Sequence, residues 1–273
     1  MLASDKKTAL VIGHPGHELR VFHWLEIMRP AVFVVTDGSG RTGRSRLPST
    51  TRIVEQARAS SGVFYGPLTD ARAYAAILGR DYACFSGLMR KLADYLIDEE
   101  ISCVAGDALE GYNPTHDACR LLIGAAVEMA QRVTGREVEN FEFSLTGKPE
   151  NRGTGDDDGA VNLTLDDAAF ARKMAVARSY TELESEVNEA ITLNQLDAFR
   201  VECLRRVPNR PPVFPDGYKP YYEQYGEQQV LSGHYNYVIR YQDHLRPLGE
   251  ALWNQVDADL PRYLESRNVQ VTS

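Results

Sequence analysis

Short apolar runs alternate with segments of helical spacing along the first half of this chain. Residues 9–12 and 31–35 are unbroken apolar runs, which is the pattern of strands buried on both faces. Between them, residues 18–28 place apolar side chains at the spacing of a helix that packs on a core. Strands and helices in this order predict an α/β fold, with a Rossmann-like, mostly parallel sheet flanked by helices. The alternation continues in expected helices at 50–61, 85–99 and 116–133 and expected strands at 62–66 and 101–105.

The second half has a different pattern. Residues 165–193 have helical spacing over a length that fits one or two helices, and residues 218–241 carry seven of the fourteen tyrosines. We therefore expect a core at 1–150 and a helical, tyrosine-rich extension at 151–273 that packs on the core or completes it. The alternation of apolar positions over 235–241 fits a half-buried strand, whereas exposed tyrosines would suit a carbohydrate or a protein interface. We favour core or subunit packing for these tyrosines.

Composition narrows the class of protein. The 273 residues include 30 basic and 38 acidic side chains, a net charge of −8, and no basic patch stands out, so we expect no nucleic-acid partner. The four cysteines form no C-x-x-C pair, which excludes a cysteine zinc ribbon. The sequence shows neither a signal peptide nor about 18 consecutive apolar residues. We expect a cytoplasmic protein without a membrane span, and a homo-oligomer is an open alternative to a monomer.

Three histidines follow expected strands. His14 and His17 are three residues apart in the turn after the first strand, and His116 follows the strand at 101–105. Active sites of parallel sheets lie at the carboxyl ends of the strands, so the three imidazoles are expected to share one edge of the sheet. Three imidazoles with an open fourth position suit a catalytic Zn²⁺ ion, although another divalent metal also fits. The alternative is that they are structural turn and helix-cap histidines.

Four short motifs make the chain resemble the LmbE/PIG-L superfamily of zinc-dependent N-deacetylases. Residues 13–18 (GHPGHE) correspond to the family's A-H-P-D-D-E, and 113–116 (NPTH) to its H-P-D-H. Residues 36–40 (TDGSG) and 52–55 (RIVE) correspond to its glycine-rich turn and its R-x-x-E pair. The motifs occur in the family's order over roughly residues 8–135. The resemblance implies the same α/β fold and hydrolysis of an amide bond at a metal centre.

The resemblance implies three metal ligands, of which one is substituted, and it also implies that the family's general base is missing. His14 and His116 match family ligands, and His17 stands where the family has a ligand aspartate. Gly16 stands where the family has an aspartate thought to act as general base, a role that glycine cannot fill. Another carboxylate must then take the proton, or the chemistry is different or lost. The carboxylates considered as replacements are Glu18, Asp37, Asp107, Glu110 and Asp117.

These candidates differ in their expected placement. Asp37 and Asp107 directly follow strands and should face the cleft, and Glu18 matches a family glutamate that supports the loop. Each carboxylate has an alternative role as a helix cap or as the partner that holds a ligand histidine. For the substrate, Tyr112 is a candidate oxyanion donor. Arg52 and Asn113 are candidate substrate contacts, although Arg52 is also spaced for a surface ion pair with Glu55. Arg44 and Arg46 in the basic loop could meet an anionic substrate, but we expect them to be solvated.

The sequence thus predicts a metal-dependent, deacetylase-like hydrolase of C–N amide bonds. The expected substrate is a small molecule or glycan, namely an N-acylated amino sugar or a related natural-product conjugate. One alternative is a related fold with altered chemistry, such as ester hydrolysis. The other is a non-catalytic metal- or glycan-binding protein that has lost its general base.

Overall fold

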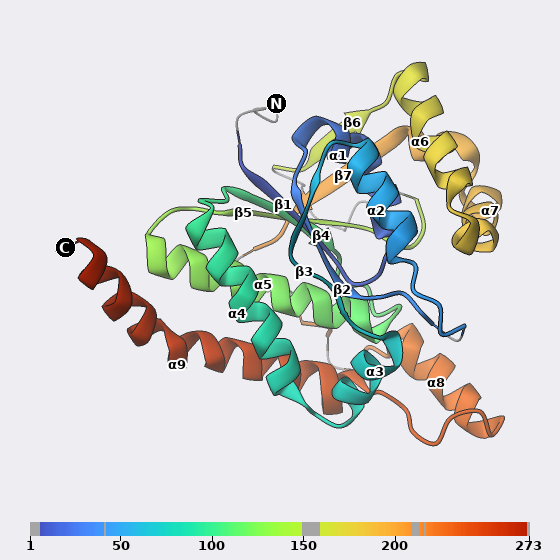
Figure 1. Cartoon of the computed structure of the whole chain (residues 1–273). Coiled ribbons are helices and arrows are strands. Elements are labelled where there is room, and N and C mark those ends of the chain that lie inside the picture. The colour runs from blue at the N-terminus through green and yellow to red at the C-terminus, as the bar shows by residue number, and fades with distance from the viewer. Residues whose placement is uncertain (1–5, 41, 149–158, 209–212, 216, 272–273) are drawn as a thin grey trace.

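A computed structural model describes residues 6–40, 42–148, 159–208, 213–215 and 217–271. Within these residues, seven strands form one sheet in the spatial order β3-β2-β1-β4-β5-β7-β6 (Figure 1). The strands are β1 (Thr8–Ile12), β2 (Ala31–Thr36), β3 (Ser60–Leu68), β4 (Cys103–Asp107), β5 (Glu139–Phe143), β6 (Val161–Thr164) and β7 (Val201–Arg206).

The sheet is parallel from β3 to β5, and β7 joins it antiparallel to β5. β1 lies between β2 and β4, in a register that pairs Val11 with Phe33 on one side and with Gly106 on the other. The carboxyl ends of β1 and β4 are therefore neighbours. The mostly parallel α/β fold expected from the apolar runs is confirmed.

Helices cover both faces of the sheet (Figure 1). Successive strand residues point to opposite faces, so Leu10 and Ile12 pack towards α1, α2 and α6, whereas Ala9 and Val11 pack towards α4, α5 and α9. The helices are α1 (Phe22–Met28), α2 (Leu47–Gln56), α3 (Asp70–Leu78), α4 (Tyr82–Asp98), α5 (Pro114–Thr134), α6 (Asp167–Ser179), α7 (Glu184–Asn194), α8 (Tyr221–Leu231) and α9 (Arg246–Val271). Short helical turns are η1 (His17–Val21), η2 (Thr181–Leu183), η3 (Leu196–Arg200) and η4 (Tyr241–Leu245).

The segment at 235–241 is not the half-buried strand that its alternation suggested. Residues 221–231 form α8, and the chain then runs without regular pairing to the wide helical turn η4. Tyr237 is 71% exposed, whereas Tyr241 is buried in the core. Tyr225 and Tyr235 meet edge to face, with ring centroids 6.4 Å apart. Tyr225, Tyr235 and Tyr237 line a cavity, and Tyr241 packs in the core, so the segment does not form the expected strand.

Other boundaries differ locally from the expectation. The helix expected at 50–61 spans Leu47–Gln56, because Arg58 takes a left-handed φ of 58° and turns the chain into β3. The long helical pattern at 165–193 is two helices, α6 and α7. The expected boundary at residue 150 lies outside the described residues, and the strands on its far side, β6 and β7, extend the sheet.

A buried ion pair fixes α6 against the first half of the chain. Glu202 on β7 accepts from Lys173 Nζ on α6 at 2.8 Å. Its carboxylate also accepts from the backbone N–H groups of His23 and Trp24 at the start of α1, at 2.9 and 2.8 Å. Glu202 and Lys173 are 1% and 3% exposed. This pair therefore holds α6 against β7 and against the start of α1.

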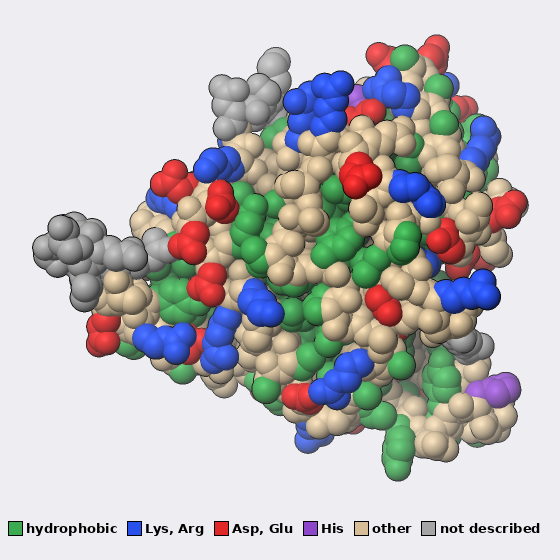
Figure 2. Space-filling view, viewed as in Figure 1, with side chains coloured by type: hydrophobic (Ala, Val, Ile, Leu, Met, Phe, Trp, Pro, Cys, Tyr) green, Lys and Arg blue, Asp and Glu red, His purple; other side chains and the backbone are tan. Residues whose placement is uncertain are grey.

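On the face shown in Figure 2, acidic and basic side chains lie interspersed among small apolar areas. None of the described helices combines the length and the apolar character that crossing a bilayer requires.

Lys173→Met should lower the free energy of unfolding by about 3–5 kcal/mol, because Glu202 would keep a buried charge without its cation. Urea denaturation measures the change. Arg246→Met is the matched control, since Arg246 pairs with Glu250 on an exposed helix surface and should contribute less than about 1 kcal/mol. Equal effects of the two substitutions would contradict a structural role for the buried pair.

Candidate metal centre

Three histidine side chains meet at the carboxyl edge of the sheet. His14 and His17 lie in the turn after β1, and His116 lies in the first turn of α5, which follows β4. The ring centroids are 5.3 Å apart for His14 and His17, 5.1 Å for His14 and His116, and 4.5 Å for His17 and His116. All three rings meet edge to face. The structure thus brings together the histidines that the sequence proposed as ligands.

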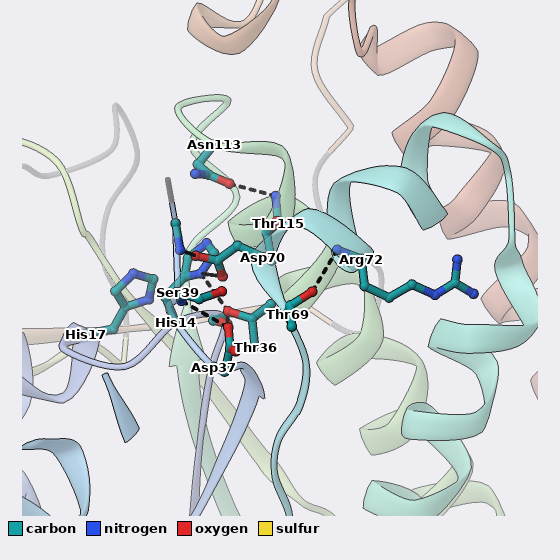
Figure 3. Close-up of polar contacts among 12 residues, drawn as sticks. His14, His17, Thr36, Asp37, Ser39, Thr69, Asp70, Arg72, Asn113 and Thr115 are labelled. Atoms are coloured by element: carbon teal, nitrogen blue, oxygen red, sulfur yellow. Dashed lines mark hydrogen bonds and ion pairs between the residues drawn. The ribbon is translucent and has the colours of Figure 1, made fainter. Parts of the chain in front are cut away.

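Carboxylates contact the Nδ1 atoms of two of the rings. His14 Nδ1 lies 2.9 Å from Asp70 Oδ1 and 2.7 Å from Thr36 Oγ1, as Figure 3 shows. His17 Nδ1 lies 2.9 Å from Asp107 Oδ2. A carboxylate on one ring nitrogen fixes the orientation of the imidazole and leaves the other nitrogen for a ligand bond.

Asp107 ties the two neighbouring strands together beneath the histidines. Its Oδ2 accepts the backbone N–H of Gly13 at 2.7 Å as well as contacting His17. A Cβ at Gly13 would lie 2.9 Å from this oxygen, so the close approach requires glycine. Complete burial raises the pKa of Asp107 to about 7, although the Gly13 N–H opposes the shift.

The electrostatics of the cluster favour neutral imidazoles at His17 and His116. Burial lowers the pKa of both His17 and His116 well below the usual value, and the neighbouring histidines lower both further. Burial works to raise the pKa of Asp70, but hydrogen bonds from His14, Thr36 and the Gly40 N–H outweigh it and hold this pKa below its usual range. Neutral imidazole is the form that binds a metal ion.

Gly16 has a conformation and a neighbour that exclude a side chain. Its φ is +107°, in the region that favours glycine. A Cβ built at this position would lie 2.2 Å from Leu183 Cδ1, which η2 places over the turn. The space beside the position of the family's aspartate is therefore occupied by a leucine.

Two of the candidate replacement bases accept hydrogen bonds from backbone N–H groups of their own loops. Glu18 is fully buried and accepts the backbone N–H of Gly16 at 2.8 Å, and burial raises its pKa to about 7. Asp37 Oδ1 accepts the N–H of Ser39 at 2.9 Å, within the turn after β2. The expectation that Asp37 faces the histidines is not met by these contacts, because its carboxylate closes a local turn instead.

Two further candidates also stabilise backbone. Glu110 accepts the N–H of Leu145 at 3.0 Å, and Asp117 accepts the N–H groups of Glu110 and Gly111 at 3.2 and 3.1 Å. Burial raises the pKa of Asp117 to about 7. Both carboxylates shape the loop between β4 and α5, which carries His116 at its end.

The three candidate substrate contacts differ in whether they border the cavities next to the histidines. Asn113 caps α5 by accepting the N–H of Thr115 at 2.8 Å. Tyr112 is 49% exposed and stacks on Tyr221, with centroids 5.1 Å apart. Arg52 donates to Ser49 Oγ at 2.8 Å on the surface of α2, away from the cavities that border the histidines.

Sequence reasoning missed Asp70 and gave too little weight to Arg46. Asp70 begins α3, where Thr69 caps the helix by accepting the N–H of Arg72. A Thr-Asp pair is a helix-start signal, but only the folded chain brings Asp70 to His14, 56 residues away. Arg46, which the sequence suggested to be solvated, packs over Gly38 and borders the histidine cluster.

Two cavities adjoin the cluster and share His17, Arg46, Tyr112 and His116. The α7 cavity has a volume of about 470 Å³ and extends beneath α7. The tyrosine cavity, about 940 Å³, extends towards α3 and α8. Its wall includes Asp70, Tyr74, Asn113, Tyr221, Tyr225 and Tyr235.

The atoms of the cluster indicate whether it can hold a metal ion. As the described side chains stand, no three His, Cys, Asp or Glu residues close around one point as metal ligands. Yet His14 Nε2 and His116 Nδ1 are buried without a hydrogen-bond partner. Buried nitrogen atoms without partners are costly, and an ion bound at this cluster would satisfy them. The donor set, three imidazoles with two carboxylates on their other nitrogens, is therefore one that a divalent metal fits.

No protein-family model and no curated protein sequence matches the chain. A solved deacetylase from the biosynthesis pathway of teicoplanin matches its structure with a TM-score of 0.50 and 12% identity, over 73% of this chain and 98% of that chain. The chain has this deacetylase's fold. The conserved protein TT1542 from Thermus thermophilus aligns with a TM-score of 0.49 and 15% identity, over 78% of this chain and 99% of its own.

The α/β fold implied by the resemblance is thus confirmed by comparison of structures. A likeness at 12% identity shows the fold alone, and the chemistry of this chain depends on the side chains described above.

Gly16→Ala should lower the free energy of unfolding by about 2–4 kcal/mol, since alanine is strained at this φ and meets Leu183. A double-mutant cycle with Leu183→Ala should show favourable coupling, because the second change removes the clash. Gly87→Ala is the control: this glycine of α4 has open space around it, and the change should be neutral or stabilise by up to about 1 kcal/mol. Absence of coupling would contradict the packing of Leu183 on Gly16.

Proposed function

We propose that this protein is a metal-dependent hydrolase that cleaves the amide bond of an N-acylated amino sugar or a related glycan conjugate. The observation that carries the proposal is the cluster of His14, His17 and His116, with two rings held by carboxylates at the carboxyl edge of a parallel sheet. The fold shared with a deacetylase of the teicoplanin pathway supports the reaction class.

His14, His17 and His116 would hold the metal, which we propose to be zinc. When bound, the ion supplies a Lewis acid that polarises the amide carbonyl of the substrate. Asp107 acts through His17 as a positioning residue, since it is completely buried and its Oδ2 contacts the ring from behind.

Asp70 is the carboxylate that we assign to receive the proton of the attacking water. Among the carboxylates considered at this site, Asp70 both touches a ligand histidine and lines the tyrosine cavity. Asp70 Oδ2 accepts the backbone N–H of Gly40 at 2.7 Å, as Glu18, Asp37 and Glu110 accept N–H groups of their own loops. Those three carboxylates, however, line neither cavity, and Asp70 does. The role that the family gives to position 16 would thus be served from α3.

Tyr112 and Arg46 border both cavities next to His17 and His116. The Tyr112 hydroxyl group can donate to a developing oxyanion, and the Arg46 guanidinium provides positive charge beside it. The tyrosine cavity offers aromatic faces with polar tips, which suit the ring of a sugar. We therefore place the amino-sugar part of the substrate in the tyrosine cavity.

The purified protein should contain about one zinc ion per chain, and His116→Ala should lose it, because the variant keeps only two of three ligands. Elemental analysis of protein dialysed against buffer measures the content. His234→Ala is the matched control, since His234 lines the tyrosine cavity outside the three-histidine cluster. Metal-free wild-type protein with an intact fold would contradict the proposal.

Asp70→Asn and Asp107→Asn should separate proton transfer from ligand positioning. At saturating zinc, Asp70→Asn should lower kcat on an N-acylglucosamine by about 10²–10⁴-fold, because the amide cannot take a proton. Asp107→Asn should weaken zinc affinity by about 10–100-fold and recover most of kcat when zinc is added. Recovery of Asp70→Asn by zinc would show that this residue only positions His14.

A further inference from the structure

The α7 cavity is apolar where it leaves the histidines. Leu183 seals it against Gly16, at the place where the family resemblance puts a carboxylate. Val187, Ala190 and Ile191 of α7 form one wall, and Met174 of α6 and Leu145 form the other. The cavity therefore begins at His17 and His116 and runs between two helices over aliphatic side chains.

Beyond Arg46 at its inner end, the charged groups along this cavity do not favour an anionic ligand. Lys173 is paired with Glu202, and Arg20 donates to the backbone carbonyls of Ser144 and Gly147. The acidic Glu186 and Glu189 also line it and would repel a phosphate or a carboxylate. An uncharged, aliphatic occupant is the chemistry that this lining accepts.

The volume decides what kind of aliphatic group would fill the cavity. About 470 Å³ corresponds to roughly fifteen times the ~30 Å³ that one water molecule occupies in the liquid. An acetyl group, with two carbon atoms, would leave most of this space unfilled. A chain of several methylene groups would replace that space with contacts to both helices.

We propose that the α7 cavity binds the acyl chain of the substrate, and that the substrates are amides of medium-length fatty acids. The inference rests on the proposed function, because the carbonyl carbon must lie at the histidines. Water adds its oxygen to that carbon, the C–N bond breaks, and the nitrogen takes a proton. The products are a fatty acid, whose chain occupies the α7 cavity, and a free amine on the side of the tyrosine cavity.

The test measures binding separately from turnover. Isothermal titration of the metal-free full-length protein with N-acetyl-, N-butyryl-, N-hexanoyl- and N-octanoylglucosamine should show Kd falling by about fourfold for each added methylene group. Ala190→Trp should abolish this dependence on chain length and leave N-acetylglucosamine binding unchanged, because the indole would fill the cavity beyond the histidines. Ile191→Phe serves the same purpose if Ala190→Trp does not fold.

Asn188→Trp is the matched control, since Asn188 is exposed on the same helix and does not line the cavity. A Kd that does not depend on chain length, or equal weakening by Ala190→Trp and Asn188→Trp, would overturn the inference. Turnover of N-acetylglucosamine by the zinc-loaded protein, without any gain from longer chains, would keep the hydrolase and overturn the acyl site. A chain-length gain without turnover of any member would support the acyl site and overturn the hydrolase.

Discussion

The site depends on a single buried carboxylate, that of Asp107. It ends β4, has no exposed surface, and accepts the Gly13 N–H of the neighbouring strand end while holding His17. A buried polar group is tolerated only where hydrogen bonds replace its hydration. The turn after β1 must therefore stay within reach of β4, and this fixes both its glycine and the direction of its histidine. The parallel register of β1 and β4 provides that distance.

The sequence was most informative where burial imposes a pattern. β1, β2, β4 and α5 were predictable because strands buried on both faces, and a helix buried between the sheet and other helices, leave clear apolar signatures. The three histidines were predictable because they follow such strands. Asp70 was not, since its contact with His14 exists only after α3 has packed. The Glu202–Lys173 pair likewise joins segments whose meeting no local pattern encodes.

Arginine placement shows the same limit. Arg52 matches a motif but lies beside Ser49 on α2, whereas Arg46, without a motif, borders both cavities. Arg52 lies inside α2, whereas Arg46 directly precedes this helix as its N-cap residue. Sequence reasoning assigned Arg52 because it matches the R-x-x-E motif, and it expected Arg46 to be solvated because the loop at 41–49 is polar and basic. Only the folded chain shows that the residue before the helix, and not the one in the motif, borders the cavities.

The two cavities share their inner ends at His17, Arg46, Tyr112 and His116 but extend towards different helices. A substrate cleaved at this junction would yield two fragments that already lie in separate compartments. Neither fragment would then have to pass the other on its way to solvent. Release would follow a random order, and an excess of one product would compete for only half of the site. Under the proposed function, product inhibition would therefore depend on which fragment accumulates, and not on the total amount of product.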